Sequence, residues 1–544
     1  MTGSDKGFSH IDGAELRRRI AAAHAGATEI AFLDLRERGP FHHAQILFSV
    51  NLPLSRLELE IARLVPRRAT PVVLTDGGEA VRLAERGAAR LLELGYTDVA
   101  VLKGGLKAWQ AAGGERFSGN NVPSKAFGEF VAENYDTPMM SADSVAAALA
   151  ADRDLVILDS RPYDEFHRMS IPGGVNVPGA ELLYRVRSMA PDPRTTVVVN
   201  CAGRTRSIIG AQSLVNAGIP NPVAALENGT MGWQLAGHGL AQGATEVGGA
   251  PDAAALAAAQ KDAAQVAARF GAAAIDRETV AAWTAEAEAG SRTLYLLDVR
   301  TAEEFAAGTW PAARHAPGGQ LVQATDEYLA TRGARIVLVD GEAVRAPMTA
   351  AWLRQLGFAD TFWLAGGLAA AEALAPQPEP GPLDFREVET VSAHEAKAVL
   401  DSGEAAALID LADSVTFERG HIPGAWWGVR ARLVEGLVRM PAIGFLILTS
   451  PDAVLAHYGA RDLMAARPDL IVRVLAGGTP AWTEAGLPLE TGMPAAFCEP
   501  DDHWPRPYES PESARAAMQA YLDWEFGLTE QLRRDGMAPF QKIS

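Results

Sequence analysis

One pattern occurs four times along the 544-residue chain, and this repetition constrains the fold more than any other feature. Each copy has a short apolar run ending in aspartate, and then a second apolar run that ends just before one marked position. Internal repeats of this kind indicate several copies of one structural unit. We therefore expect four homologous α/β units. The aspartates are Asp34, Asp159, Asp298 and Asp410, and the marked positions are Asp76, Cys201, Asp340 and Ser450.

Each copy continues with a helical, alanine-rich stretch, a third apolar strand and a turn, and three copies then have a tryptophan (Trp109, Trp233 and Trp482). Strands that alternate with helices predict a mostly parallel sheet with right-handed crossovers and helices on both faces. Ligands bind such sheets where strands end and helices begin. The four marked positions are therefore the four candidate sites.

These landmarks divide the chain into four repeats and a tail. The stretch from Pro376 to Pro382 alternates proline with other residues and is the clearest linker. Ser510, Pro511 and Glu512 predict a helix start, with serine as cap and proline in the first turn. The expected segments are repeat 1 over residues 1–118, repeat 2 with an alanine-rich linker over 119–265, repeat 3 over 266–376, repeat 4 over 383–495, and a helical extension over 496–544.

Composition excludes several classes of function. The net charge of −18 disfavours a nucleic acid or an anionic membrane as partner, since both require clustered Lys and Arg. The only cysteines, Cys201 and Cys498, are too few for a disulfide framework or a cysteine-rich metal cluster. The histidines lack metal-ligand spacing, so no metal site is expected. With no apolar run that could span a membrane and no signal peptide, we expect a cytoplasmic protein.

The second repeat carries the most specific motifs: Asp159-Ser160-Arg161, Asp164-Glu165-Phe166, Ile171 to Pro178, and Cys201 to Ser207. In these residues the chain resembles the rhodanese domain, in four tandem copies. The resemblance implies a sulfurtransferase that moves sulfane sulfur from an anionic donor such as thiosulfate, through a persulfide on Cys201, to cyanide or a thiol. It implies neither a metal nor an organic cofactor. The loop lacks the Gly-Val-Thr core of the tandem thiosulfate and mercaptopyruvate enzymes, so mercaptopyruvate is a less expected donor.

The chemistry of sulfur transfer explains why a cysteine would stand in this loop. The thiolate is the nucleophile, and a strand-to-helix turn favours it through unpaired backbone N–H groups and the helix dipole. Gly203 permits tight curvature, and Arg204 and Arg206 are suited to binding an oxyanion. We expect the donor and the persulfide to be held by Ala202, Gly203, Arg204, Thr205, Arg206 and Ser207.

Asp159 and Arg161 are interpreted as a buried pair that orders the site, although a purely structural pair is at least as well supported, since repeats 1 and 3 have the same pair. The other three repeats lack a thiol at the marked position and are expected to be inactive. Two of their loops also carry a glutamate, Glu79 or Glu342, which would repel an anion. These repeats either support the active one by packing or bind a regulatory or acceptor molecule.

Two other functions stay open. A non-catalytic sulfur carrier or scaffold would use the degenerate repeats to dock partners. A phosphatase or arsenate reductase is disfavoured, because related phosphatase loops have five residues between cysteine and arginine, whereas four separate Cys201 from Arg206. Cys498 is expected to be inert, with a relay thiol as the alternative. The sequence leaves the oligomeric state open.

Overall fold

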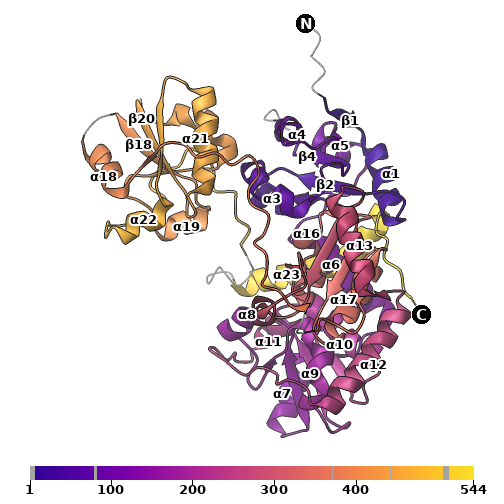
Figure 1. The fold of residues 1–544 in the computed structure, drawn as a ribbon. Coiled ribbons are helices and arrows are strands. Elements are labelled where there is room, and N and C mark those ends of the chain that lie inside the picture. The colour runs from indigo at the N-terminus through magenta and orange to yellow at the C-terminus, as the bar shows by residue number, and fades with distance from the viewer. Residues whose placement is uncertain are drawn as a thin grey trace.

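The computed structural model describes residues 7–78, 82–369, 372–402, 405–441, 443–505 and 514–543. Within these ranges the chain forms four sheets, one for each predicted repeat, and ends in a long helix. Figure 1 shows the first three repeats gathered together, with the fourth standing to one side. Four tandem α/β repeats with a helical tail are thus confirmed. The helix start expected at Ser510, Pro511 and Glu512 lies outside the described residues.

All four sheets share one core of five parallel strands in the same order, which in repeat 2 is β6–β10–β9–β7–β8. The strands of repeat 2 are β6 (Met139–Met140), β7 (Leu155–Asp159), β8 (Val175–Asn176), β9 (Thr196–Asn200) and β10 (Val223–Leu226). Their counterparts are β1 (Ser9–Ile11), β2 (Ile30–Asp34), β3 (Val50–Asn51), β4 (Val72–Thr75) and β5 (Val99–Leu102) in repeat 1; β11 (Ala273–Ile275), β12 (Leu294–Asp298), β13 (Arg314–His315), β15 (Arg335–Val339) and β16 (Thr361–Leu364) in repeat 3; and β17 (Thr390–Val391), β18 (Ala406–Asp410), β19 (Trp426–Trp427), β20 (Phe445–Thr449) and β21 (Ile471–Leu475) in repeat 4.

Helices cover the sheets and join the repeats. Repeat 1 and the connection to repeat 2 contain α1 (Gly13–His24), α2 (Arg38–His43), α3 (Leu57–Leu64), α4 (Leu83–Glu93), α5 (Gly105–Ala111) and α6 (Val122–Tyr135). Repeat 2 and the linker after it contain α7 (Ala142–Ala150), α8 (Tyr163–Arg168), α9 (Leu182–Met189), α10 (Thr205–Ala217), α11 (Gly229–Leu235) and α12 (Ala253–Arg269). Repeat 3 contains α13 (Arg277–Glu288), α14 (Ala302–Ala307), α15 (Gly318–Gln323), α16 (Thr325–Tyr328) and α17 (Arg345–Gln355); repeat 4 contains α18 (Ala393–Asp401), α19 (Ser414–Arg419), α20 (Leu433–Gly436), α21 (Val454–Ala466) and α22 (Gly478–Glu484); the tail helix is α23 (Ala514–Asp535). Among the described residues, no helix is both long and apolar enough to cross a lipid bilayer.

The three repeated tryptophans pack in the cores of their repeats. Trp109, Trp233 and Trp482 are each at most 4% exposed. Each indole Nε1 donates a hydrogen bond to the backbone carbonyl six residues later, at 2.8 to 2.9 Å. The indole therefore fills the core and at the same time fixes the chain leaving the last helix of its repeat.

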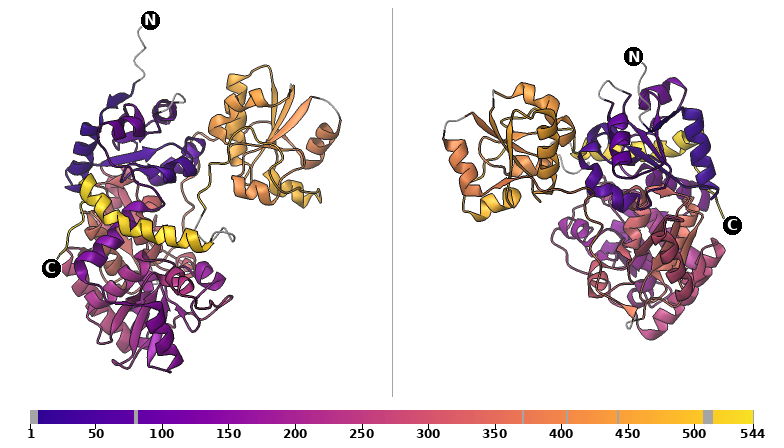
Figure 2. Two further views of the ribbon diagram at one scale, coloured as in Figure 1. Left: turned by 180° about the vertical axis from the view of Figure 1, so that it is seen from behind. Right: turned by 45° about the horizontal axis from the view of Figure 1, so that its top comes forward.

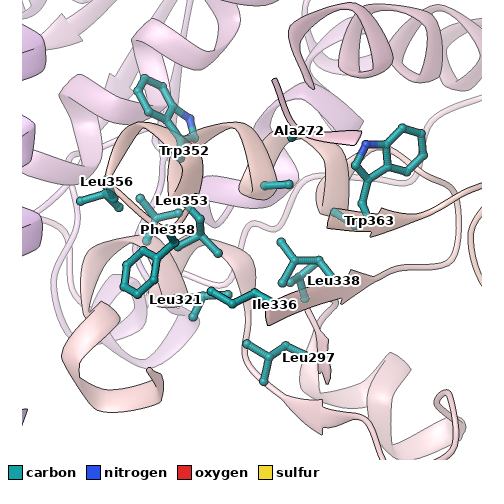
Figure 3. Packing of buried hydrophobic residues seen from close by; sticks show 14 of the residues in the cluster. Ala272, Leu297, Leu321, Ile336, Leu338, Trp352, Leu353, Leu356, Phe358 and Trp363 are labelled. Carbon is teal, nitrogen blue, oxygen red and sulfur yellow. The ribbon is translucent and has the colours of Figure 1, made fainter. Parts of the chain in front are cut away.

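The first three repeats share cores and one sheet. The short strand β14 (Thr331–Arg332) of repeat 3 pairs antiparallel with β2 of repeat 1, which the sequence did not predict. Two apolar clusters contain residues of both repeats 2 and 3. Figure 3 shows the repeat 3 part of one of them around Trp352 and Leu353 of α17. The Trp352 Nε1 also donates to Ser213 Oγ on α10 at 2.8 Å. Repeats 2 and 3 are therefore packed against each other through buried surface.

The tail helix α23 lies across the boundary between repeats 1 and 2 (Figure 2). Leu528 and Leu532 enter the core of repeat 1. Met518 and Leu522 pack with Ala202 and Met231 of repeat 2. A segment that follows all four repeats in the sequence thus returns to cover the Cys201 loop.

The aspartate that ends the first core strand is buried in every repeat, but only three of the four carry the arginine that pairs with it. Arg36, Arg161 and Arg300 each bond their own aspartate through Nε and Nη2. Asp410 instead accepts from the Ala412 N–H at 2.8 Å, and burial raises its pKa to about 6. Repeat 4 therefore buries a carboxyl group without this pairing cation.

We expect D410N to stabilise the chain at neutral pH. Because the pKa of Asp410 is raised in the folded state, the native state binds more protons than the unfolded state between about pH 4 and 6, and stability falls as pH rises through that range. The substitution removes the buried charge and should add about 1–3 kcal/mol to the free energy of unfolding at pH 8. Chemical denaturation at pH 8 and pH 4 measures the gain, which should vanish at pH 4.

D298N is the matched control, since it removes a carboxylate that is bonded to Arg300. Breaking this buried pair should cost about 3 kcal/mol at pH 8. A loss of stability in D410N at pH 8 similar to that in D298N would contradict the interpretation of Asp410 as an uncompensated buried carboxyl.

Candidate active site

Cys201 directly follows β9 and begins the loop that leads into α10, at the carboxyl end of the parallel sheet. The residue is 2% exposed, and its Sγ lies 3.5 Å from the Oγ of Ser207 in the first turn of α10. Ser207 donates to the carbonyl of Arg204 at 2.8 Å. The sulfur therefore lies beside a helix start, where backbone N–H groups lack helical partners and favour an anion.

Repeat 3 displays the property of this loop directly, because Asp340 stands at the position of Cys201. Its carboxylate accepts hydrogen bonds from the backbone N–H groups of residues 343–346, at 2.7 to 3.1 Å. Asp340 is fully buried. In repeat 3 the loop backbone thus surrounds a buried carboxylate with four N–H donors, as anion-binding helix starts do.

The loops of repeats 1 and 4 are also filled by their own side chains. Asp76 accepts from the N–H groups of Gly78 and Ala84, and the Ser450 Oγ accepts from the Ala456 N–H. Of the two glutamates expected to repel an anion, Glu342 is ion-paired with Arg345, and Glu79 lies outside the described residues.

A glycine at the start of α11 holds the Cys201 loop from behind. Gly229 has φ +55°, and a Cβ there would lie only 2.4 Å from the Cys201 carbonyl and 2.5 Å from the Gly203 carbonyl. The next two N–H groups, of Thr230 and Met231, donate to the carbonyls of Cys201 and Ala202. This close approach explains the repeated glycine of the turn, since Gly105, Gly367 and Gly478 meet their loops in the same way.

Asp159 and Arg161 form the expected buried pair, and two further residues connect this pair to the loop. Asn200 donates to Asp159 Oδ2 at 2.8 Å and lies 3.1 Å from Thr230 Oγ1. Thr230 donates to the Cys201 carbonyl at 3.0 Å. The pair therefore supports the loop backbone through hydrogen bonds and does not itself contact Sγ. The sequence-based interpretation missed Asn200 and Thr230, although each stands next to a repeat landmark.

Arg204 is buried in an ion pair that crosses from repeat 2 to α6. Its Nε and Nη2 donate to the two carboxylate oxygens of Glu129 at 2.7 and 2.8 Å, and its Nη1 donates to Asn228 at 3.1 Å. The guanidinium also lies 4.0 Å from the ring centre of Phe526 on α23. The charge of Arg204, expected to bind the donor, is thus largely neutralised by a carboxylate.

Arg206 is paired as well, and its partners reach into repeat 3. It donates to Glu165 of its own repeat at 2.8 Å and to Gln320 of repeat 3 at 3.3 Å. Arg345, at the matching position of repeat 3, bonds Glu304 of its own repeat and Glu181 of repeat 2. The arginine after each loop therefore donates a hydrogen bond to a residue of the other repeat, Arg206 to Gln320 and Arg345 to Glu181.

A cavity of about 890 Å³ lies beside the Cys201 loop, where three repeats and the tail meet. Ala202 and Arg206 contribute the loop side of its lining. Thr205 points elsewhere: its Oγ1 is buried without a hydrogen-bond partner, and its methyl group packs on Gly128 of α6. No group of three or more described His, Cys, Asp or Glu side chains is arranged to hold a metal ion. The remaining lining comes from residues 116–125, α15, α16, α23 and the residues His43, Glu165, Met231, Ala324, Trp504 and Pro505.

Helix α23 places Tyr521 and Glu525 against Gly203, with ring and carboxylate atoms 3.2 to 3.4 Å from where a Cβ at Gly203 would lie. Burial raises the pKa of Glu525 to about 7, although Lys125 lowers it. Burial also raises the pKa of the Tyr521 hydroxyl well above its usual value. The sequence held no signal for these residues, because nothing in the repeat pattern says where the tail packs.

Comparison with known proteins agrees with this geometry. The rhodanese-like domain family matches residues 14–112, 141–236 and 280–373. The crystal structure of thiosulfate sulfurtransferase from Pseudomonas aeruginosa is 47% identical, with TM-score 0.93, over 99% of this chain and 100% of that chain. A protein from Anabaena sp. is 27% identical over 19% of this chain and 82% of its own, with TM-score 0.18, and a rhodanese-like domain protein from Staphylococcus aureus is 18% identical over 19% and 98%, with TM-score 0.17. No curated protein sequence matches the chain.

The repeated unit is thus the rhodanese-like domain, which matches repeats 1, 2 and 3 directly. Repeat 4 has the same strand order as the other three. The chain belongs to the rhodanese-like family, and the resemblance found in its sequence is confirmed.

Replacing Glu129 tests whether the Arg204 pair is structural. E129Q leaves the buried Arg204 without its counter-charge and should lower the free energy of unfolding by about 3 kcal/mol. The double variant E129L/R204M, which removes both charges, should regain most of that loss. Chemical denaturation followed by intrinsic fluorescence measures both.

E133Q on the same helix is the control, because the Glu133–Arg533 pair is exposed and should contribute less than about 1 kcal/mol. If E129L/R204M were as unstable as E129Q, charge neutralisation would not explain the loss. The fold would then require the contacts of Arg204 with Asn228 and Phe526.

Proposed function

We propose that the protein is a thiosulfate sulfurtransferase that carries sulfane sulfur on Cys201. The observation that carries this proposal is the set of four backbone N–H donors around the carboxylate of Asp340. Cys201 stands at the same position of the same loop in repeat 2, so the backbone there is suited to a thiolate and to the terminal sulfur of a persulfide. The related Pseudomonas aeruginosa enzyme, a thiosulfate sulfurtransferase, supports the choice of donor.

The proposed reaction has two displacements at sulfur. In the first, the Cys201 thiolate attacks the sulfane sulfur of thiosulfate, a new S–S bond forms, and the old S–S bond breaks with its electron pair leaving on sulfite. In the second, cyanide attacks the terminal sulfur, thiocyanate leaves, and the Cys201 thiolate returns. A thiolate acceptor would take the sulfur in the same way and leave as a persulfide. No electron is gained or lost overall, so neither displacement requires an external oxidant or reductant.

We propose a part for the two loop arginines that differs from the one expected from sequence. Because Arg204 and Arg206 are bonded to Glu129 and Glu165, we propose that they set the shape of the loop and the wall of the cavity. The Asp159–Asn200–Thr230 hydrogen bonds are proposed to hold the Cys201 carbonyl, so that the N–H groups stay aimed at the sulfur. We place the enzyme in the cytoplasm, where reducing conditions keep the free thiol of Cys201 available.

Cys201→Ser should abolish sulfur transfer. The rate of thiocyanate formation from thiosulfate and cyanide should fall at least about a thousandfold, because the nucleophile is lost. Mass spectrometry of the wild-type chain after thiosulfate treatment should show one added sulfur atom on Cys201, and cyanide should remove it.

Cys498→Ser is the control within the same chain. The Cys498 sulfur accepts a hydrogen bond from the Val429 N–H in repeat 4, and burial raises the pKa of its thiol, so it is less often a thiolate. This variant should keep wild-type activity. A wild-type chain that gains no sulfur from thiosulfate would favour the scaffold function, and full activity in Cys201→Ser would exclude the Cys201 persulfide.

A further inference from the structure

The proposed donor carries two negative charges, but the loop arginines offer little net positive charge to receive it. Arg204 is bonded by both oxygens of Glu129, and Arg206 is bonded by Glu165. Each pair is close to neutral as seen from the cavity. A dianion in this cavity therefore needs positive charge from another part of the molecule.

The geometry of displacement says where that charge would act. Attack on the sulfane sulfur proceeds in line, so the sulfonate group leaves on the side away from Sγ. In repeat 3 the loop N–H groups surround the side chain at the position that Cys201 takes in repeat 2. The sulfonate end of the donor must then face the cavity walls that other elements contribute, which are α23, residues 116–125 and the helices of repeat 3.

Lys125 and Tyr521 lie together on that wall. Lys125 is in the first turn of α6, lines the cavity and is 3% exposed. Its Nζ donates to the Asn120 side chain at 2.8 Å and also to the Tyr521 hydroxyl. The same ammonium lies 5.1 Å from the ring centre of Trp524. The aromatic rings shield the cation from bulk water, which strengthens its attraction for an anion in the cavity.

Carboxyl groups near Lys125 oppose its charge, and burial raises the pKa of two of them. Glu327 also lines the cavity, where it accepts a hydrogen bond from Asn121. Glu525 lies beside Tyr521 on α23, and burial raises its pKa to about 7, so it is partly protonated at neutral pH. Asp326 of repeat 3 is also buried, and burial raises its pKa to about 6. Arg116 lines the same cavity, but it is exposed and its field is screened.

We propose that Lys125 and Tyr521 form the subsite for the sulfonate end of the donor, and that α23 is therefore a functional part of the active site. This inference rests on the proposed sulfurtransferase function. As the S–S bond of the donor breaks, its electron pair moves onto the departing sulfite. The ammonium of Lys125 stabilises that growing charge, and the Tyr521 hydroxyl hydrogen bonds to a sulfite oxygen. No proton need be transferred to either group.

The subsite is tested with two donors that differ in the sulfonate group. Thiosulfate has it, and an alkyl hydropersulfide lacks it, yet both load Cys201 with one sulfur. K125M should raise the KM for thiosulfate about tenfold or more, which corresponds to about 1.4 kcal/mol of lost binding. Loading by the hydropersulfide should stay within about twofold of wild type, and so should discharge of the loaded enzyme by cyanide. K125R, which keeps the positive charge, should recover most of the affinity for thiosulfate.

Y521F keeps the ring and its packing and should raise the KM for thiosulfate by about three- to tenfold. It carries the test if K125M does not fold. K103M is the matched control, because Lys103 lines the cavity at the filled loop of repeat 1 and should not affect either donor.

Unchanged KM for thiosulfate in folded K125M and Y521F would overturn the subsite. Equal losses with both donors would also overturn it, since that result would mean a structural role for these residues. Failure of the proposed function looks different: the wild-type chain itself would then take no sulfur from either donor.

Discussion

An anion held by backbone N–H groups at a strand-to-helix loop is the interaction on which the rest of this structure depends. The fold places the loop at the carboxyl end of β4, β9, β15 and β20, and in each repeat the side chain at the marked position occupies it. Asp76 and Asp340 fill it with a carboxylate, and Ser450 fills it with a hydroxyl. In the proposed reaction, Cys201 supplies the nucleophile. The chemistry therefore depends on one side chain, whereas the environment that would activate it belongs to the fold.

The filled loop of repeat 3 has a second consequence, because repeats 2 and 3 meet at their loops. Arg206 reaches Gln320 across the boundary, and Arg345 reaches Glu181 in return. A carboxylate fixed at Asp340 is satisfied by its own loop and needs no ligand. Repeat 3 can thus serve as a permanent wall of the Cys201 cavity, and an aspartate at position 340 is consistent with this packing role.

The sequence predicts the features that recur in the repeats. It does not predict the contacts that residues outside the repeated pattern make with the Cys201 loop. The strands, the position of Cys201 and the Asp159–Arg161 pair follow from patterns of a few residues that recur at similar spacing. Glu129 and Tyr521 could not be found this way, because their helices are not part of the repeated pattern and they contact the loop across long stretches of sequence. The sequence places Arg204 and Arg206 close after Cys201. It cannot show that each guanidinium is already bonded to a carboxylate.

These long-range contacts suggest that the loop and the elements around it have different functions in the proposed reaction. A backbone loop can stabilise a thiolate, but it offers little to distinguish one sulfur donor from another, since every donor presents a similar sulfur atom to Cys201. Discrimination must come from groups that meet the rest of the donor, and here those groups stand on α6 and α23. A tail helix that packs on the loop of one repeat and in the core of another can only form this wall once repeats 1 and 2 are folded and in contact. Repeats 1 and 3 are then part of this cavity together with repeat 2, although neither has a thiol at its marked position.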